Sequence, residues 1–144
     1  TLLREHRGDG HVAALVAAGI SGRESNVLHA AAGRVPREYL ARTRDYDQEA
    51  WRRHERGLAD RGLLDEDGSL TALGRELKDR IEATTDTLGL SALDALTDEE
   101  VETLFQALTP LTRTVIAGGD LPDLTPMTLR RDELHDGSAH LGAR

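Results

Sequence analysis

Arginines gather in one stretch of this sequence, between residues 34 and 61. Eight arginines and six acidic residues lie there, a local balance of +2, whereas the whole chain of 144 residues has a net charge of −8. A guanidinium group can bind a guanine edge with two hydrogen bonds or hold a phosphate, and a glutamine amide can read adenine. The candidate DNA-binding residues are Arg42, Arg44, Gln48, Arg52, Arg53 and Arg56. Double-stranded DNA is therefore one expected partner.

A second group of ionisable residues surrounds Gly8 and Gly10. Neighbouring histidines and carboxylates can tune a proton transfer or bind a metal, and arginines can hold an anionic ligand. The candidate ligand-binding residues are Arg4, Glu5, His6, Arg7, Asp9 and His11, with His29 on the next expected helix. Because no zinc-site spacing is present, we expect a small-molecule effector and neither metal nor cofactor. The alternative is that these residues form caps, salt bridges and dimer contacts.

Catalytic and export signals are missing from the sequence. There is no Ser-His-Asp order, phosphate loop or dinucleotide fingerprint, so we expect a protein that is not an enzyme. If it were one, general acid–base chemistry by His6, His11 or His29 would be the first hypothesis.

The chain has no cysteine, no apolar run of membrane-spanning length and no signal-peptide pattern. We therefore expect a cytoplasmic protein without a membrane partner.

Helices must position these residues, and their ends can be located from capping signals. Ser21 and Glu24 form a capping-box pattern, as do Thr97 and Glu100. The expected helices cover residues 11–18 with glycine breaks at both ends, 22–32, 36–43, 48–61 capped by Asp47, 71–88 capped by Thr71, and 99–117 kinked or restarted at Pro110. Two short extended pieces around the acidic turn at 65–69 predict a β-hairpin. Residues 121–144 are expected to be an extended or disordered tail.

Trp51 and Leu58 are spaced to face the core from the same side of the helix at 48–61. Anchored in this way, that helix would leave its arginines outermost. This arrangement is what a helix that enters a DNA groove requires.

The segment "RGLLDEDGSLTALGRELKDRI", with the preceding helix, turn and helix, resembles MarR-type regulators. The resemblance implies an all-α fold with a small β-hairpin wing, a winged helix-turn-helix, over residues 1–120. Its helix-turn-helix would be 36–61 and its wing 63–71. Helices at both ends, Thr1–His6 and Glu99–Ala117, would form a homodimer whose recognition helices lie about one DNA turn apart. A ligand near the dimer junction would change their spacing.

The segments "LLREHRGDGHVAALVAAGISG", "VLHAAAG" and "GGDLP" also resemble an uncharacterised actinobacterial helix-turn-helix family. Members of that family have a further helical portion upstream, so we expect Thr1 to lie inside a longer chain. These resemblances imply a DNA-binding transcriptional regulator that responds to a small ligand.

Acidic residues favour an alternative function. Asp45 stands where the turn commonly has glycine, Glu49 lies on the face expected to meet phosphates, and the expected wing tip is Asp65-Glu66-Asp67. Carboxylates at these places would repel DNA. The alternative is a winged-helix module that binds a ligand or a protein and does not bind DNA.

Overall fold

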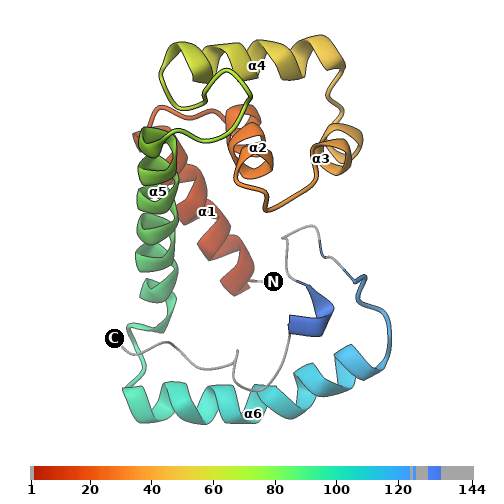
Figure 1. Cartoon of the computed structure of the whole chain (residues 1–144). Coiled ribbons are helices and arrows are strands. Elements are labelled where there is room, and N and C mark those ends of the chain that lie inside the picture. The colour runs from red at the N-terminus through yellow and green to blue at the C-terminus, as the bar shows by residue number, and fades with distance from the viewer. Residues whose placement is uncertain (1, 124, 126–129, 134–144) are drawn as a thin grey trace. The chain divides into compact units, whose positions relative to one another are not determined.

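The computed structural model describes residues 2–123, 125 and 130–133 (Figure 1). In this part of the chain the helices are α1 (Leu2–Ala17), α2 (Gly22–Ala31), α3 (Arg37–Thr43), α4 (Gln48–Asp60), α5 (Ala72–Leu90) and α6 (Asp98–Ala117), with short 3-10 turns at Ser91–Leu93 and Arg131–Glu133. The chain divides into two compact units, residues 1–92 and 93–144.

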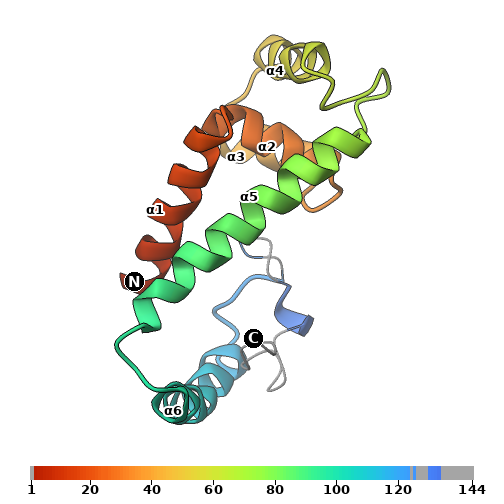
Figure 2. The ribbon, with the colours of Figure 1, turned by 90° about the vertical axis from the view of Figure 1, so that its left-hand side faces the viewer.

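Helices α1 and α5 pack against each other, and the two ribbon views show that they are inclined to one another (Figures 1 and 2). The predicted break before residue 11 is wrong, because α1 is continuous through Gly8 and Gly10. A Cβ atom at Gly10 would lie 3.0 Å from the Cβ of Leu88 on α5. Gly10 therefore allows a close approach of the two helices, and this tertiary contact outweighs the low helix propensity of glycine.

The capping signals are confirmed in the first unit. The hydroxyl of Ser21 accepts from the Glu24 amide while the Glu24 carboxylate accepts from the Ser21 amide. The Asp47 carboxylate accepts from the Ala50 amide at 2.6 Å, and the Thr71 hydroxyl accepts from the Gly74 amide at 3.0 Å. Local side-chain chemistry thus fixes where α2, α4 and α5 begin.

The predicted β-hairpin wing at 63–71, and with it the winged fold class, is wrong. No β-strand is formed in the described part of the chain, and Leu64 and Leu70 make only an isolated bridge. The Ser69 amide donates to the carboxylates of Asp65 and Asp67, which closes a tight loop. Thr71 then caps α5 immediately after the bridge, so no residues are left to extend a ladder.

The predicted anchoring of α4 is confirmed. Trp51 is 1% exposed and Leu58 is 0% exposed in the core of the first unit. The apolar residues assigned by sequence to the hairpin, Leu63, Leu64 and Leu70, are also buried there. The loop after α4 therefore contributes to the core even though it forms no strands.

The second unit contains α6, which begins at the predicted Thr97–Glu100 capping box. We predicted a kink or a restart at Pro110, and the restart is wrong because α6 continues through Pro110 to Ala117. Most of the predicted tail, 121–144, lies outside the described residues. In the part that is described, the Arg131 amide donates to the Asp123 carbonyl at 2.9 Å. None of the helices described is long and apolar enough to cross a lipid bilayer.

Candidate nucleic-acid interface

A turn of four residues joins α3 to α4. Asp45 lies in this turn with φ of 53°, the left-handed conformation that glycine adopts most easily. Asp and Asn tolerate this conformation better than other non-glycine residues, which explains how an aspartate occupies the position. Asp47 then caps α4, so the turn ends where the second helix begins.

Tyr46, the residue between them, fastens the turn to α2. Its ring meets the Trp51 ring edge-on, with centroids 5.1 Å apart. Its hydroxyl donates to the Arg23 carbonyl and accepts from the Asn26 amide group, both at 2.9 Å. α4 is therefore held to α2 by aromatic packing and by a satisfied polar group.

The outer face of α4 carries exposed arginines. Arg52, Arg53 and Arg56 are exposed, as are Gln48 at the start of α4 and Arg42 and Arg44 at the end of α3. Among the described residues, none of these six side chains has a hydrogen-bond or ion-pair partner. The structure thus brings the predicted DNA-binding residues onto two adjacent elements and leaves their polar groups available.

Other arginines of the same region have intramolecular partners. Arg37 lies 3.6 Å from the Glu55 carboxylate and over the Trp51 ring, and Arg61 lies 3.3 Å from the Glu24 carboxylate. Arg23 lies over the Tyr46 ring. The sequence did not predict these contacts. Each one joins an arginine to a residue more than ten positions away, and only the folded packing brings the two together.

Acidic residues also lie near this face. Asp45 and Glu49 are exposed, and so are the three acidic residues of the loop after α4. Hydrogen bonds from Ser69 and Asp65 lower the pKa of Asp67 to about 2, while the hydrogen bond with Asp67 raises the pKa of Asp65. The loop therefore remains anionic at neutral pH.

Most of the predicted ligand-binding residues do not converge. Arg4 pairs with Glu5 at the surface, and Asp9 is exposed. The Nε2 atom of His6 lies 2.9 Å from the Ser91 hydroxyl oxygen, and Arg7 lies 2.8 Å from the Asp86 carboxylate. The side chains of His6 and Arg7 thus connect α1 to α5 and its C-terminal end.

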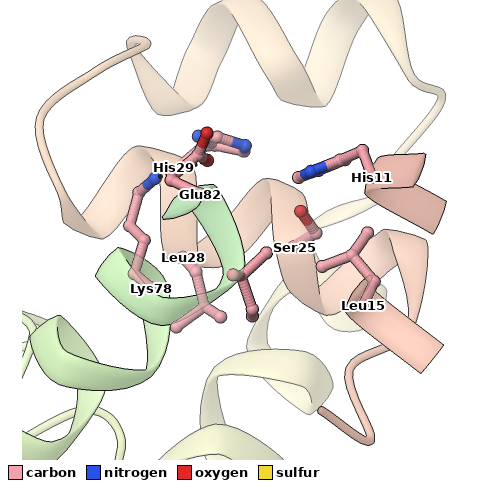
Figure 3. Close-up of a pocket in the computed structure, with 8 residues that line it drawn as sticks. His11, Leu15, Ser25, Leu28, His29, Lys78 and Glu82 are labelled. Atoms are coloured by element: carbon pink, nitrogen blue, oxygen red, sulfur yellow. Dashed lines mark hydrogen bonds and ion pairs between the residues drawn. The ribbon is translucent and has the colours of Figure 1, made fainter. Parts of the chain in front are cut away.

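His11 and His29 do come together, at a small cavity between α1, α2 and α5 (Figure 3). Their ring centroids are 6.4 Å apart. The cavity measures about 10 Å³, room for one water molecule. The lining residues are His11, Leu15, Ser25, Leu28, His29, Lys78, Ile81 and Glu82. Nothing in the described part of the chain groups three metal-ligating side chains at one place.

Helices α3 and α4, with the turn between them, define a helix-turn-helix protein. Residues 1–122 match the model of a helix-turn-helix family, and the chain belongs to that family. Neither the curated proteins nor the solved structures compared with the chain include a match. The family match covers helix-turn-helix proteins in general, so the closer resemblances to MarR-type and actinobacterial regulators stay predictions.

Proposed function

We propose that this protein binds double-stranded DNA through the outer face of α4 and thereby regulates transcription. The observation that carries this proposal is the contrast between the two sides of α4. Trp51 and Leu58 are buried on one side, while Arg52, Arg53 and Arg56 are exposed on the other and have no partner among the residues that the structure describes. Membership of a helix-turn-helix family supports the same function.

The spacing on α4 suggests how DNA would be contacted. Gln48, Arg52 and Arg56 are four residues apart, so they form one row along the helix, and Arg53 lies beside it. The N-terminal turn of a recognition helix normally enters the major groove. Gln48 would then reach base edges, and Arg52 and Arg53 would hold phosphates together with Arg42, Arg44 and Arg56.

Salt dependence of DNA binding tests this proposal. Affinity for mixed double-stranded DNA should be measured by fluorescence anisotropy from 25 to about 200 mM salt. Each phosphate contact contributes about 0.9 to the slope of log affinity against log salt. Replacing Arg52 and Arg53 together with alanine should therefore weaken binding at low salt and reduce the slope by about 1 to 2.

Arg80→Ala is the matched control. Arg80 is an exposed arginine on α5, outside the helix-turn-helix, so its removal changes the net charge without changing the proposed interface. Equal losses in Arg80→Ala and Arg53→Ala would mean that binding follows net charge alone and would refute the assignment to α4. Absence of DNA binding by the wild-type chain at the lowest salt would overturn the function itself.

We further propose that the regulator acts as a homodimer. On α6, Leu108, Leu111 and Val115 are exposed at intervals of three and four residues, the spacing of a helix that packs along another helix. Leu111→Lys should shift the mass measured by light scattering toward the monomer. Gln106→Lys adds the same charge on the opposite side of α6 and should leave the mass unchanged. A monomeric wild-type chain would contradict this proposal.

A small-molecule effector, a cytoplasmic location and the lack of catalytic activity belong to the same proposal. The resemblance to MarR-type regulators supports the effector, although the cavity at His11 and His29 has room for only one water molecule. The alternative function is a module that binds a ligand or a protein and not DNA. The net charge of −8 and the acidic loop after α4 favour it, and failure of the DNA-binding experiment would support it.

A further inference from the structure

The side chains around the one-water cavity form a polar cluster inside the first unit. It consists of His11 from α1, His29 from α2, and Lys78, Glu82 and Thr85 from α5, and we call it the histidine cluster. Figure 3 shows His29 beside Lys78 and Glu82, with His11 extending toward them from α1. The cluster therefore lies where α2 packs against the α1–α5 pair.

Hydrogen bonds fix His11 in this cluster. The Thr85 hydroxyl is fully buried and donates to the Ile81 carbonyl at 2.8 Å, so its oxygen is left to accept. The Nδ1 atom of His11 lies 3.0 Å from that oxygen and is therefore its donor. This bond ties α1 to α5.

We propose that the histidine cluster makes the packing of α2 depend on pH, because proton uptake at His29 weakens the attachment of α2 to α1 and α5. The site is a proton-binding site at a helix interface. Its effect on structure does not depend on the proposed function, but its effect on DNA binding does.

Geometry favours the neutral form of His29. Its Nδ1 atom is buried and has no hydrogen-bond partner in the described chain. In the neutral ring with the proton on Nε2, the buried atom carries only a lone pair. Protonation would place a charged N–H group at the same position without an acceptor, which is costly in a buried site.

The charges that face His29 also oppose a second positive charge. Lys78 and Glu82 face it from α5, His11 from α1, and Arg34 from the connection after α2. Glu82 is the one carboxylate among them, and it already lies 3.2 Å from Lys78 and 3.7 Å from Arg7. Its negative charge is thus shared between two cations before either histidine takes up a proton.

The pKa values follow from these surroundings. Burial, followed by the charge of Lys78, lowers the pKa of His29 to about 4. Burial also lowers the pKa of His11. A histidine released into solvent has a pKa of about 6.5, so the detached form of α2 binds protons more readily than the packed form. The packed form is therefore favoured above pH 6.5 and loses that advantage as the pH falls from about 6.5 toward 4.

Movement of α2 would reach the helix-turn-helix. Tyr46 is hydrogen-bonded to α2, and Arg61 at the end of α4 lies 3.3 Å from Glu24 on α2. α4 would consequently change its position with respect to α1 and α5 when α2 loosens. Acid pH would then weaken DNA binding through a group that lies away from the arginine face.

Hydrogen exchange of the α2 amides in the full chain tests the proposal. After correction for intrinsic exchange rates, the opening equilibrium of wild-type α2 should rise about thirtyfold from pH 7.5 to 5.0, as expected for a pKa that changes from about 4 to 6.5. His29→Gln, which cannot titrate, should abolish most of this rise. His54→Gln, at a histidine on α4, should retain it. A rise that persists in His29→Gln, or no rise in the wild-type chain, would overturn the proposal.

A titration of the wild-type chain keeps the test decisive if His29→Gln does not fold. The His29 ring should titrate by NMR with a midpoint near 4, and a midpoint at 6.5 or above would refute the proposal. DNA affinity at pH 7.5 and 5.0 forms a separate arm. If the chain binds no DNA at either pH, the proposed function fails while the exchange and titration results still decide the role of the cluster.

Discussion

Trp51 and Glu55 are joined by a hydrogen bond along one turn of α4, in which the indole Nε1–H group donates to the carboxylate at 2.6 Å. The same carboxylate lies 3.6 Å from Arg37, whose guanidinium lies over the indole ring. Glu55 is thus committed to the inner side of the helix-turn-helix. Although it is close in sequence to Arg52 and Arg56, it pairs with neither of them in the described structure.

Removing this carboxylate should destabilise the fold. In Glu55→Ala the buried indole N–H group loses its acceptor, so the free energy of unfolding measured in urea should fall by about 1–3 kcal/mol. Glu49→Ala, at an exposed carboxylate on the same helix, should change it by less than about 0.5 kcal/mol. Equal effects of the two changes would show that the indole hydrogen bond contributes nothing specific.

Asp45 gives a second prediction, about the turn before α4. Its φ of 53° is tolerated by aspartate and asparagine but is strained for a β-branched residue. Asp45→Val should therefore lower the free energy of unfolding by about 1–2 kcal/mol, whereas Asp45→Asn should leave it nearly unchanged. Thermal unfolding of both variants checks this. If valine is accommodated as well as asparagine, the turn has another conformation.

Signals confined to a few neighbouring residues predicted the structure well. The capping residues Ser21, Asp47, Thr71 and Thr97 all begin helices, because a side-chain acceptor needs only an amide three residues away. The burial of Trp51 and Leu58 also followed from helical spacing. For the same reason the arginines of α4 could be placed on an exposed face from sequence.

Features that depend on distant residues were not predictable in this way. Gly10 resembles a helix break until Leu88 is known to lie against it. The apolar residues near 63–70 resemble strands, but the early cap of α5 leaves no room for a ladder. His11 and His29 were candidates from sequence, whereas Lys78, Glu82 and Thr85 join them from a helix more than forty residues further on. Only the packing of α5 brings these charges to the histidines.

Pro110 gives a third prediction, for the second unit. An interior proline removes one helical hydrogen bond, and in a helix it is about 3 kcal/mol less favourable than alanine. Pro110→Ala should therefore raise the temperature at which α6 unfolds. Circular dichroism of the full chain measures this transition. Trp51, the sole tryptophan, lies in the first unit and serves as an internal control. Its fluorescence transition should not move, and a shift of both transitions together would mean that the units unfold as one.

Replacing either of two glycines in the first unit with alanine should change the free energy of unfolding, but in opposite directions. A Cβ atom at Gly74 would lie 2.1 Å from the Leu63 carbonyl oxygen, and a backbone atom cannot turn aside as a flexible side chain can. Gly74→Ala should therefore lower the free energy of unfolding by about 3 kcal/mol, because the start of α5 must move away from the loop after α4.

Gly57 is the matched case, because it also lies within a helix but has open space where a Cβ atom would be. Gly57→Ala should raise the free energy of unfolding by up to about 1 kcal/mol through the higher helix propensity of alanine. Urea unfolding followed by Trp51 fluorescence measures both variants under the same conditions. A stable, unshifted Gly74→Ala variant would mean that α5 does not pack directly on the Leu63 backbone.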